Sequence, residues 1–221
     1  MTQYAFIWDM DGTLVDSYPA IVPAALETLA AAGLEYDSEQ LHRECIRTSV
    51  GDVLERIAED HGLDLLPLKA DFNRRNDSNV SSITAMPHAG EALAALRQAG
   101  HQNFVYTHRG ASCTTILEQT GLASSFTEVV TALSGFRRKP EPDAILYLIE
   151  KYHLEKANCF YVGDRRLDVE AAVNAGISSI LYLEPGSPGS ATGLETYLVH
   201  DLLEIPALAE QLNQKEKRNS R

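Results

Sequence analysis

The chain has 221 residues, which is enough for one large domain or for a core with a smaller insertion. Its 31 acidic residues against 19 Lys and Arg give a net charge of -12, which argues against a protein that coats nucleic acid or binds an anionic membrane. No apolar run approaches the ~20 residues that span a bilayer, and the cysteines are few and far apart, so we expect a cytoplasmic protein without a membrane partner.

The first third of the chain reads as one short strand followed by helices. The apolar and aromatic run at 4–8 (YAFIW) predicts a buried central strand. Helices are predicted at 18–32, at 38–61 with a break near Ser49–Gly51, and at 67–80. Residues 17–82 are therefore expected to be a helical insert without a strand.

After residue 83 the pattern changes to an alternation of short strands and longer helices. Strands are predicted at 103–107, 127–131, 159–163 and 178–183, with helices at 88–99, up to Gly121, at 141–153 and at 167–175. This alternation is typical of parallel βαβ units. We expect a doubly wound α/β core made of residues 1–16 and 83–221, interrupted by the helical insert 17–82, with a loop at 184–193 and a frayed tail at 214–221.

Ligands of such sheets bind beyond the carboxyl ends of the strands. The polar residues expected there are Asp9, Asp11, Thr107, His108, Arg109, Arg137, Arg138, Lys139, Asp164, Arg165, Arg166 and Asp168. These positions hold six of the nineteen Lys and Arg residues of an acidic chain, which indicates an anionic substrate.

Two carboxylates follow the first strand, at Asp9 and Asp11. Side chains two positions apart in a strand point the same way, and close carboxylates are unfavourable unless a cation lies between them or one is protonated. Asp164 supplies a third acidic side chain from another strand end. Hard oxygen ligands of this kind suit Mg²⁺.

Four ordered segments resemble the motifs of the haloacid dehalogenase (HAD) superfamily. They are DMDGTL at 9–14, the hydroxyl residue Thr107, Lys139 before Pro140, and GDRRLD at 163–168. A helical insert directly after the first motif is similar to the subfamily of phosphoglycolate phosphatases and β-phosphoglucomutases, in which the insert forms a cap over the site. The resemblance implies a Mg²⁺-dependent phosphatase that acts on a small phosphorylated metabolite.

The resemblance also implies roles for individual residues. Asp9 would be the nucleophile that forms an aspartyl-phosphate, and Asp11 would be the general acid and base. Mg²⁺ would be bound by the Asp9 carboxylate, the Asp11 backbone carbonyl and Asp164.

Other residues of the motifs would assist these three. Thr107 and the amide of Gly12 would contact the phosphoryl group, and Lys139 would neutralise negative charge. Asp168 would lie behind the metal ligands and orient Lys139 or metal-bound water.

Substrate contacts are less well defined by the sequence. Arg47 and Ser49 fall where related caps select the substrate, and His108 and Arg109 are candidates beside Thr107. His108 either touches the substrate or cap or is a passive residue at the rim.

Arg165 and Arg166 allow two interpretations. They could contact an anionic part of the substrate, but we favour arginines solvated beside the metal site.

Two other functions use the same motifs. A β-phosphoglucomutase-like mutase is the nearest alternative, but residues 15–21 (VDSYPAI) lack the basic or imidazole side chain that related mutases carry. A non-catalytic binding or regulatory module on the same fold would be indicated by a missing motif residue, and none is missing. The identity of the substrate and the oligomeric state are not predicted.

Overall fold

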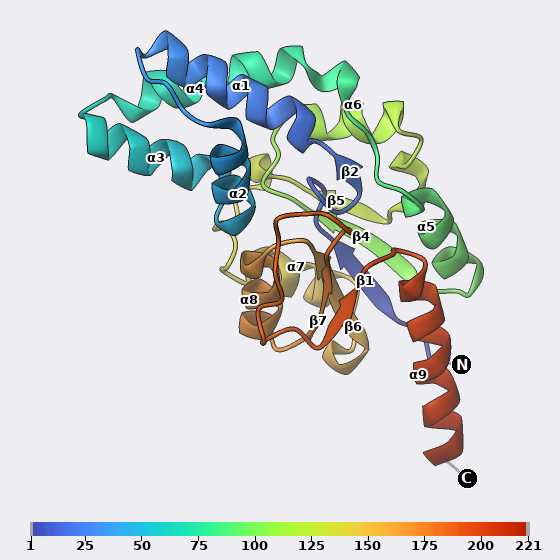
Figure 1. Cartoon of the computed structure of the whole chain (residues 1–221). Coiled ribbons are helices and arrows are strands. Elements are labelled where there is room, and N and C mark those ends of the chain that lie inside the picture. The colour runs from blue at the N-terminus through green and yellow to red at the C-terminus, as the bar shows by residue number, and fades with distance from the viewer. Residues whose placement is uncertain (1, 220–221) are drawn as a thin grey trace.

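The computed structural model describes residues 2–219 and contains a six-stranded parallel sheet with helices on both faces (Figure 1). The strand order is β5 (Glu128–Val130), β4 (Gln102–Tyr106), β1 (Ala5–Trp8), β6 (Cys159–Gly163), β7 (Ser178–Tyr182) and β8 (Tyr197–Val199). The predicted doubly wound α/β fold is thus confirmed. Residues 1, 220 and 221, which we assigned to the core, lie outside the described residues.

The alternation of side chains along β1 divides the core into two layers. Phe6 and Trp8 pack on one face of the sheet, and Ile7 packs on the other. The first face is covered by α5 (Ala89–Gln98), α6 (Ser112–Gln119) and α9 (Glu204–Asn219), and the second by α7 (Asp143–Lys151) and α8 (Arg166–Ala175). Because both faces of β1 are covered, its end is held rigidly inside the molecule.

The helical insert has a hydrophobic cluster of its own. It contains α1 (Tyr18–Ala31), α2 (Ser38–Arg47), α3 (Val50–His61) and α4 (Leu65–Ser78). The predicted break between the two middle helices is present, because Ser49 caps α3 by accepting a hydrogen bond from the Asp52 amide at 3.1 Å.

The ends of the insert lie beside each other. β2 (Val15–Asp16) and β3 (Thr84–Ala85) form a short antiparallel pair where the chain leaves the core and returns to it. We therefore propose that the helical insert comprises residues 17–82, as the sequence predicts.

Two elements at the C-terminal end differ from the expectation. β8 was not predicted, because three residues after a Gly- and Ser-rich loop carry little periodic signal. The frayed tail predicted at 214–221 was wrong for 214–219, because α9 continues through these residues. Ile205, Ala209 and Asn213 recur every four residues and bury one side of this helix. No helix among residues 2–219 is long and apolar enough to cross a membrane.

Candidate active site

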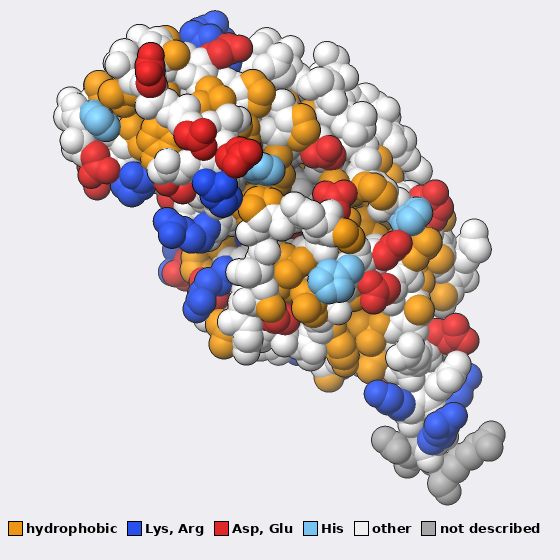
Figure 2. All heavy atoms as spheres, in the orientation of Figure 1, with side chains coloured by type: hydrophobic (Ala, Val, Ile, Leu, Met, Phe, Trp, Pro, Cys, Tyr) orange, Lys and Arg blue, Asp and Glu red, His pale blue; other side chains and the backbone are white. Residues whose placement is uncertain are grey.

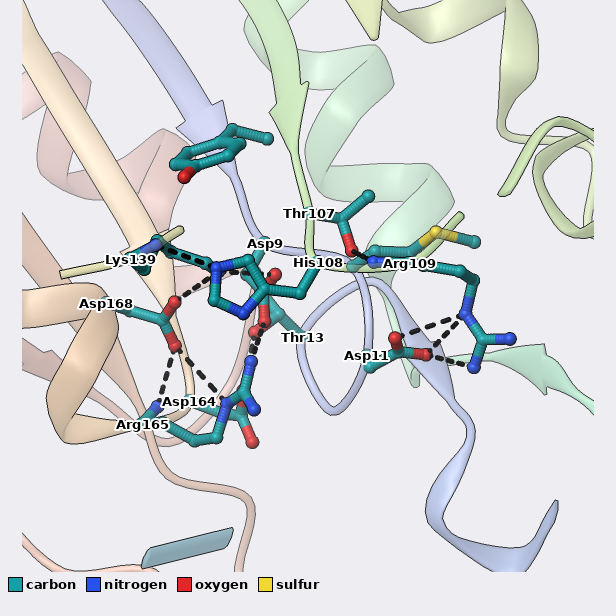
Figure 3. A network of polar contacts seen from close by, with 12 residues as sticks. Asp9, Asp11, Thr13, Thr107, His108, Arg109, Lys139, Asp164, Arg165 and Asp168 are labelled. Carbon is teal, nitrogen blue, oxygen red and sulfur yellow. Dashed lines mark hydrogen bonds and ion pairs between the residues drawn. The ribbon is translucent and has the colours of Figure 1, made fainter. Parts of the chain in front are cut away.

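Three buried acidic side chains meet at the carboxyl ends of the central strands. Asp9 follows β1, Asp164 follows the adjacent β6, and Asp168 lies in the first turn of α8 (Figure 3). One carboxylate oxygen from each lies within 4.8 Å of the others. We call this group the carboxylate cluster.

Lys139 neutralises part of the charge of the carboxylate cluster. Its Nζ donates to Asp9 Oδ1 at 2.8 Å, to Asp168 Oδ1 at 2.6 Å and to the Tyr161 hydroxyl at 3.0 Å. Burial pushes the pKa of Asp9 upward, but Lys139 and Arg165 together hold this pKa below its ordinary value. Asp9 is therefore ionised at neutral pH although it is fully buried.

The carboxylate cluster still carries more negative charge than its surroundings stabilise. Burial raises the pKa of Asp164 to about 7; Arg165 opposes this rise, and the charges of Asp168 and Asp9 add to it. Burial also raises the pKa of Asp168. Three hard oxygen donors whose ionised forms are destabilised by one another and by burial fit a divalent cation such as Mg²⁺.

Gly12 allows the chain to approach Asp164 closely. Its φ is +78°, in the left-handed region, and a Cβ at this position would lie 2.4 Å from Asp164 Oδ2. A side chain here would fill the space beside the carboxylate cluster, so the glycine is required by both its torsion angle and the contact.

Asp11 lies apart from the carboxylate cluster. Arg109 donates to its two carboxylate oxygens, with Nη2 2.6 Å from Oδ1 and Nε 3.1 Å from Oδ2 (Figure 3). The side chain that the sequence places on the same face as Asp9 is thus held by a cation from the segment that follows the neighbouring strand β4. Thr107 is buried beside this pair, and its Oγ1 accepts a hydrogen bond from the Arg109 amide at 3.1 Å.

His108 contacts the backbone of Lys139. Its Nε2 accepts a hydrogen bond from the Lys139 amide at 2.8 Å, which places the ring proton on Nδ1. Burial lowers the pKa of His108 to about 2, and the charges of Lys139 and Arg138 act in the same direction. The imidazole is therefore a neutral support for the Lys139 segment as well as part of the cavity wall.

The expectation that both arginines of GDRRLD are solvated was wrong for Arg165. Arg166 is exposed and pairs with Glu170 at 2.7 Å, but Arg165 is 9% exposed, and its Nη2 donates to Asp9 Oδ2 at 3.1 Å. The turn between β6 and α8 directs this side chain inward. Its position next to Asp164 is the only sequence signal that could have identified it.

A cavity of about 440 Å³ opens between the insert and the core. Asp11, Ser49, His108, Arg109 and Arg165 are part of its wall. The sequence missed a further group in this wall, Asn76 of α4, which is buried, and its Oδ1 has no hydrogen-bond partner among the described residues.

The two residues predicted to select the substrate lie in different places. Ser49 lines the 440 Å³ cavity, whereas Arg47 lines a separate groove of about 560 Å³. Arg43 and Arg166 border the same groove, and Figure 2 shows basic side chains gathered where the insert meets the core.

Comparisons with known proteins agree with the motifs and the fold. A model of the haloacid dehalogenase-like hydrolase family matches residues 6–182. Phosphoglycolate phosphatase of Vibrio parahaemolyticus is 30% identical over 219 residues, which cover 91% of this chain and 95% of that protein. N-acetylmuramic acid 6-phosphate phosphatase of Pseudomonas aeruginosa is 26% identical over 208 residues, covering 89% of this chain and 90% of that protein.

A solved structure shows the same fold over nearly the whole length. The crystal structure of a predicted phosphoglycolate phosphatase from Haemophilus somnus has a TM-score of 0.82 and 23% identity, and it covers 95% of this chain and 99% of that one.

Proposed function

Because this chain belongs to the haloacid dehalogenase-like hydrolases, we propose that it is a Mg²⁺-dependent phosphatase that hydrolyses a small phosphorylated metabolite through an aspartyl-phosphate on Asp9. One observation carries this proposal. Asp9 is a buried carboxylate that is kept ionised by Lys139 and lies within a cluster of three acidic side chains. Such a group is both a nucleophile and a metal ligand.

The reaction divides between Asp9 and Asp11. An Asp9 oxygen attacks phosphorus while Asp11 gives a proton to the leaving alkoxide, so that an alcohol is released and phosphate remains on Asp9. Water then attacks phosphorus and gives a proton to Asp11, which frees inorganic phosphate and restores both carboxyl groups. Arg109 pairs with the Asp11 carboxylate at the wall of the cavity that the substrate would enter, and Asp11 acts as the acid once it leaves this pair and is protonated.

Further residues would bind the metal ion or the phosphoryl group rather than attack phosphorus or transfer a proton. Asp9, Asp164 and the Asp11 backbone carbonyl would hold Mg²⁺, which when bound lowers the repulsion between carboxylate and phosphate. Thr107 and the Gly12 amide would contact the phosphoryl group. Lys139, oriented by Asp168, would balance negative charge on Asp9.

Phosphoglycolate is the first substrate to test. The choice of phosphoglycolate rests on the Vibrio relative, which is named a phosphoglycolate phosphatase. A second relative is named for an amino-sugar phosphate. The side chains that α3 and α4 contribute to the cavity wall include both polar and apolar ones. A panel of phosphorylated acids and sugars should therefore accompany phosphoglycolate.

The proposed function is tested by turnover of p-nitrophenyl phosphate and of this panel, with Mg²⁺ and with excess chelator. We expect turnover only with Mg²⁺ and none from Asp9→Asn, because an amide is not a nucleophile at this position. Asp60→Asn, which changes an exposed carboxylate on α3, should behave as the wild type.

The intermediate can be sought directly. Acid-quenched wild-type protein should carry added phosphate on the peptide that contains Asp9, and Asp9→Asn should carry none. Full turnover by a folded Asp9→Asn protein, or undiminished turnover in chelator, would contradict the proposed function.

A further inference from the structure

Each carboxylate oxygen of Asp9 accepts a hydrogen bond from a cationic side chain. Oδ1 accepts a hydrogen bond from Lys139 at 2.8 Å, and Oδ2 accepts one from Arg165 at 3.1 Å. The Asp9 side chain is 1% exposed. A phosphoryl group can reach Asp9 only after one of these two cations moves.

Arg165 is the cation that also reaches the other acids of the carboxylate cluster. Its Nε lies 3.8 Å from Asp164 Oδ1 and 3.8 Å from Asp168 Oδ2. A single positive charge within 4 Å of three carboxylates partly does what a divalent cation would do there. A divalent cation held by Asp9 and Asp164 would repel the guanidinium.

The hydrogen bonding of Arg165 is incomplete in this position. The side chain is buried, and its Nε has no hydrogen-bond partner among the described residues. A buried N–H group without an acceptor is unfavourable. Space is present for a second position, because Arg165 lines both the 440 Å³ cavity and the 560 Å³ groove.

We propose that Arg165 is an internal counter-cation, which closes the carboxylate cluster and leaves it when a divalent cation enters. Lys139 remains, because its Nζ is anchored by Asp9, Asp168 and Tyr161 together. In its second position the guanidinium lies in the 440 Å³ cavity, whose wall it already forms together with Asp11, and binds the arriving phosphoryl group through its planar donors. This second position rests on the proposed function, whereas the exchange with the metal does not.

Metal binding tests the exchange without any turnover. Mn²⁺ is titrated into the metal-free full chain, and the free ion is counted by electron paramagnetic resonance. If Arg165 closes the cluster in about nine molecules of ten, it weakens the apparent affinity about tenfold.

The variants separate charge from size. Arg165→Gln should therefore bind Mn²⁺ about tenfold more tightly than the wild type. Arg165→Lys, which keeps the charge, should lie nearer to the wild type than to Arg165→Gln. Arg166→Gln, at the exposed neighbouring arginine, should leave the affinity unchanged. Unchanged or weaker Mn²⁺ binding by a folded Arg165→Gln protein overturns the proposal.

Chemical labelling of the wild type tests the movement of Arg165 without any variant, so it applies even if a variant does not fold. Phenylglyoxal should modify Arg165 slowly in the metal-free protein, because the side chain is buried, and faster once Mg²⁺ is added. Exposed Arg43 should react at the same rate in both states. Peptide mass spectrometry reads both sites, and Arg165 labelling that does not rise with Mg²⁺ overturns the proposal.

The second position has its own readout. Arg165→Gln should lose kcat although it binds metal more tightly, a combination that general loosening of the site would not produce. Tighter Mn²⁺ binding with unchanged kcat overturns the phosphoryl contact. Tighter Mn²⁺ binding in a chain that hydrolyses no phosphate overturns the proposed function and supports the exchange.

Discussion

Lys139 Nζ lies 2.8 Å from Asp9 Oδ1, although the two residues are 130 positions apart in the chain. Neither side chain is exposed by more than 1%. Each is stabilised in its charged form by the other, because water cannot solvate either of them. The energetic consequences of removing one partner are therefore large.

We expect Lys139→Met to lower the free energy of unfolding by about 3–5 kcal/mol, because it leaves Asp9 and Asp168 buried without this partner. Urea denaturation measures this loss. Adding Asp168→Asn should recover part of the stability but no turnover. Lys151→Met, which breaks the pair between the exposed Lys151 and Glu128, should change the free energy of unfolding far less than Lys139→Met. Equal effects of the two methionine variants would contradict the expectation.

Gly12→Ala should weaken metal binding and abolish most turnover, because the new Cβ would lie 2.4 Å from Asp164 Oδ2. Gly121→Ala is the matched control, since Gly121 has a φ of +73° and, apart from itself and its chain neighbours, no described residue has an atom within 4 Å of the added Cβ. Both variants should lose about 1 kcal/mol of stability through the left-handed torsion. Only Gly12→Ala should change the Mn²⁺ isotherm, and an isotherm like that of the wild type would argue against a close approach.

Ser49 combines a structural and a binding position, so its replacement should have two effects. Ser49→Ala should lower the free energy of unfolding by about 1 kcal/mol through loss of the α3 cap. It should also change KM, because Ser49 lines the 440 Å³ cavity. Asp37→Ala removes the equivalent cap of α2, where the side chain accepts from the Gln40 amide, and should change stability alone. Identical KM values for both variants would show that Ser49 does not contribute to substrate binding.

His108 should make stability depend on pH. The unfolded chain protonates this residue below pH about 6.5, whereas the folded chain keeps it neutral down to about pH 2. Between these values the unfolded state binds more protons, so this contribution is fully present above pH 6.5 and is lost as the pH falls, by up to about 1.4 kcal/mol per pH unit. Urea denaturation of His108→Gln from about pH 6.5 to 5 should give a shallower slope than the wild type.

Two other histidines also affect the pH dependence of the free energy of unfolding. His101 is also buried, and burial lowers its pKa, so it contributes a slope of the same sign that remains in the His108 variant. Burial also lowers the pKa of His42, so His42→Gln should remove a part of the slope that His108→Gln leaves. A slope that survives His108→Gln in full would show that the imidazole is not buried as described.

Most of the fold could be predicted from local patterns. The strand at β1 is a run of apolar residues with a β-branched member, and the break before α3 follows from a serine cap. β8 and the whole of α9 escaped prediction, because three strand residues and a helix with a charged end depend on packing against the sheet rather than on periodicity.

The candidate site was predictable to a similar extent. The meeting of Asp9 and Asp164 follows from topology, since parallel strands place their carboxyl ends together. The cavity position of Asn76 did not follow, because a single polar residue on a charged helix is usually solvated.

The amino-acid sequence by itself determined most of the strands and helices up to residue 183 and the family motifs, because these are properties of short segments. Only the tertiary structure decided which charges pair. Asp11 binds Arg109 instead of joining Asp9, and Arg165 turns inward onto Asp9. Burial makes each such choice strongly favourable or unfavourable, and burial is decided by the packing of distant segments rather than by neighbours along the chain.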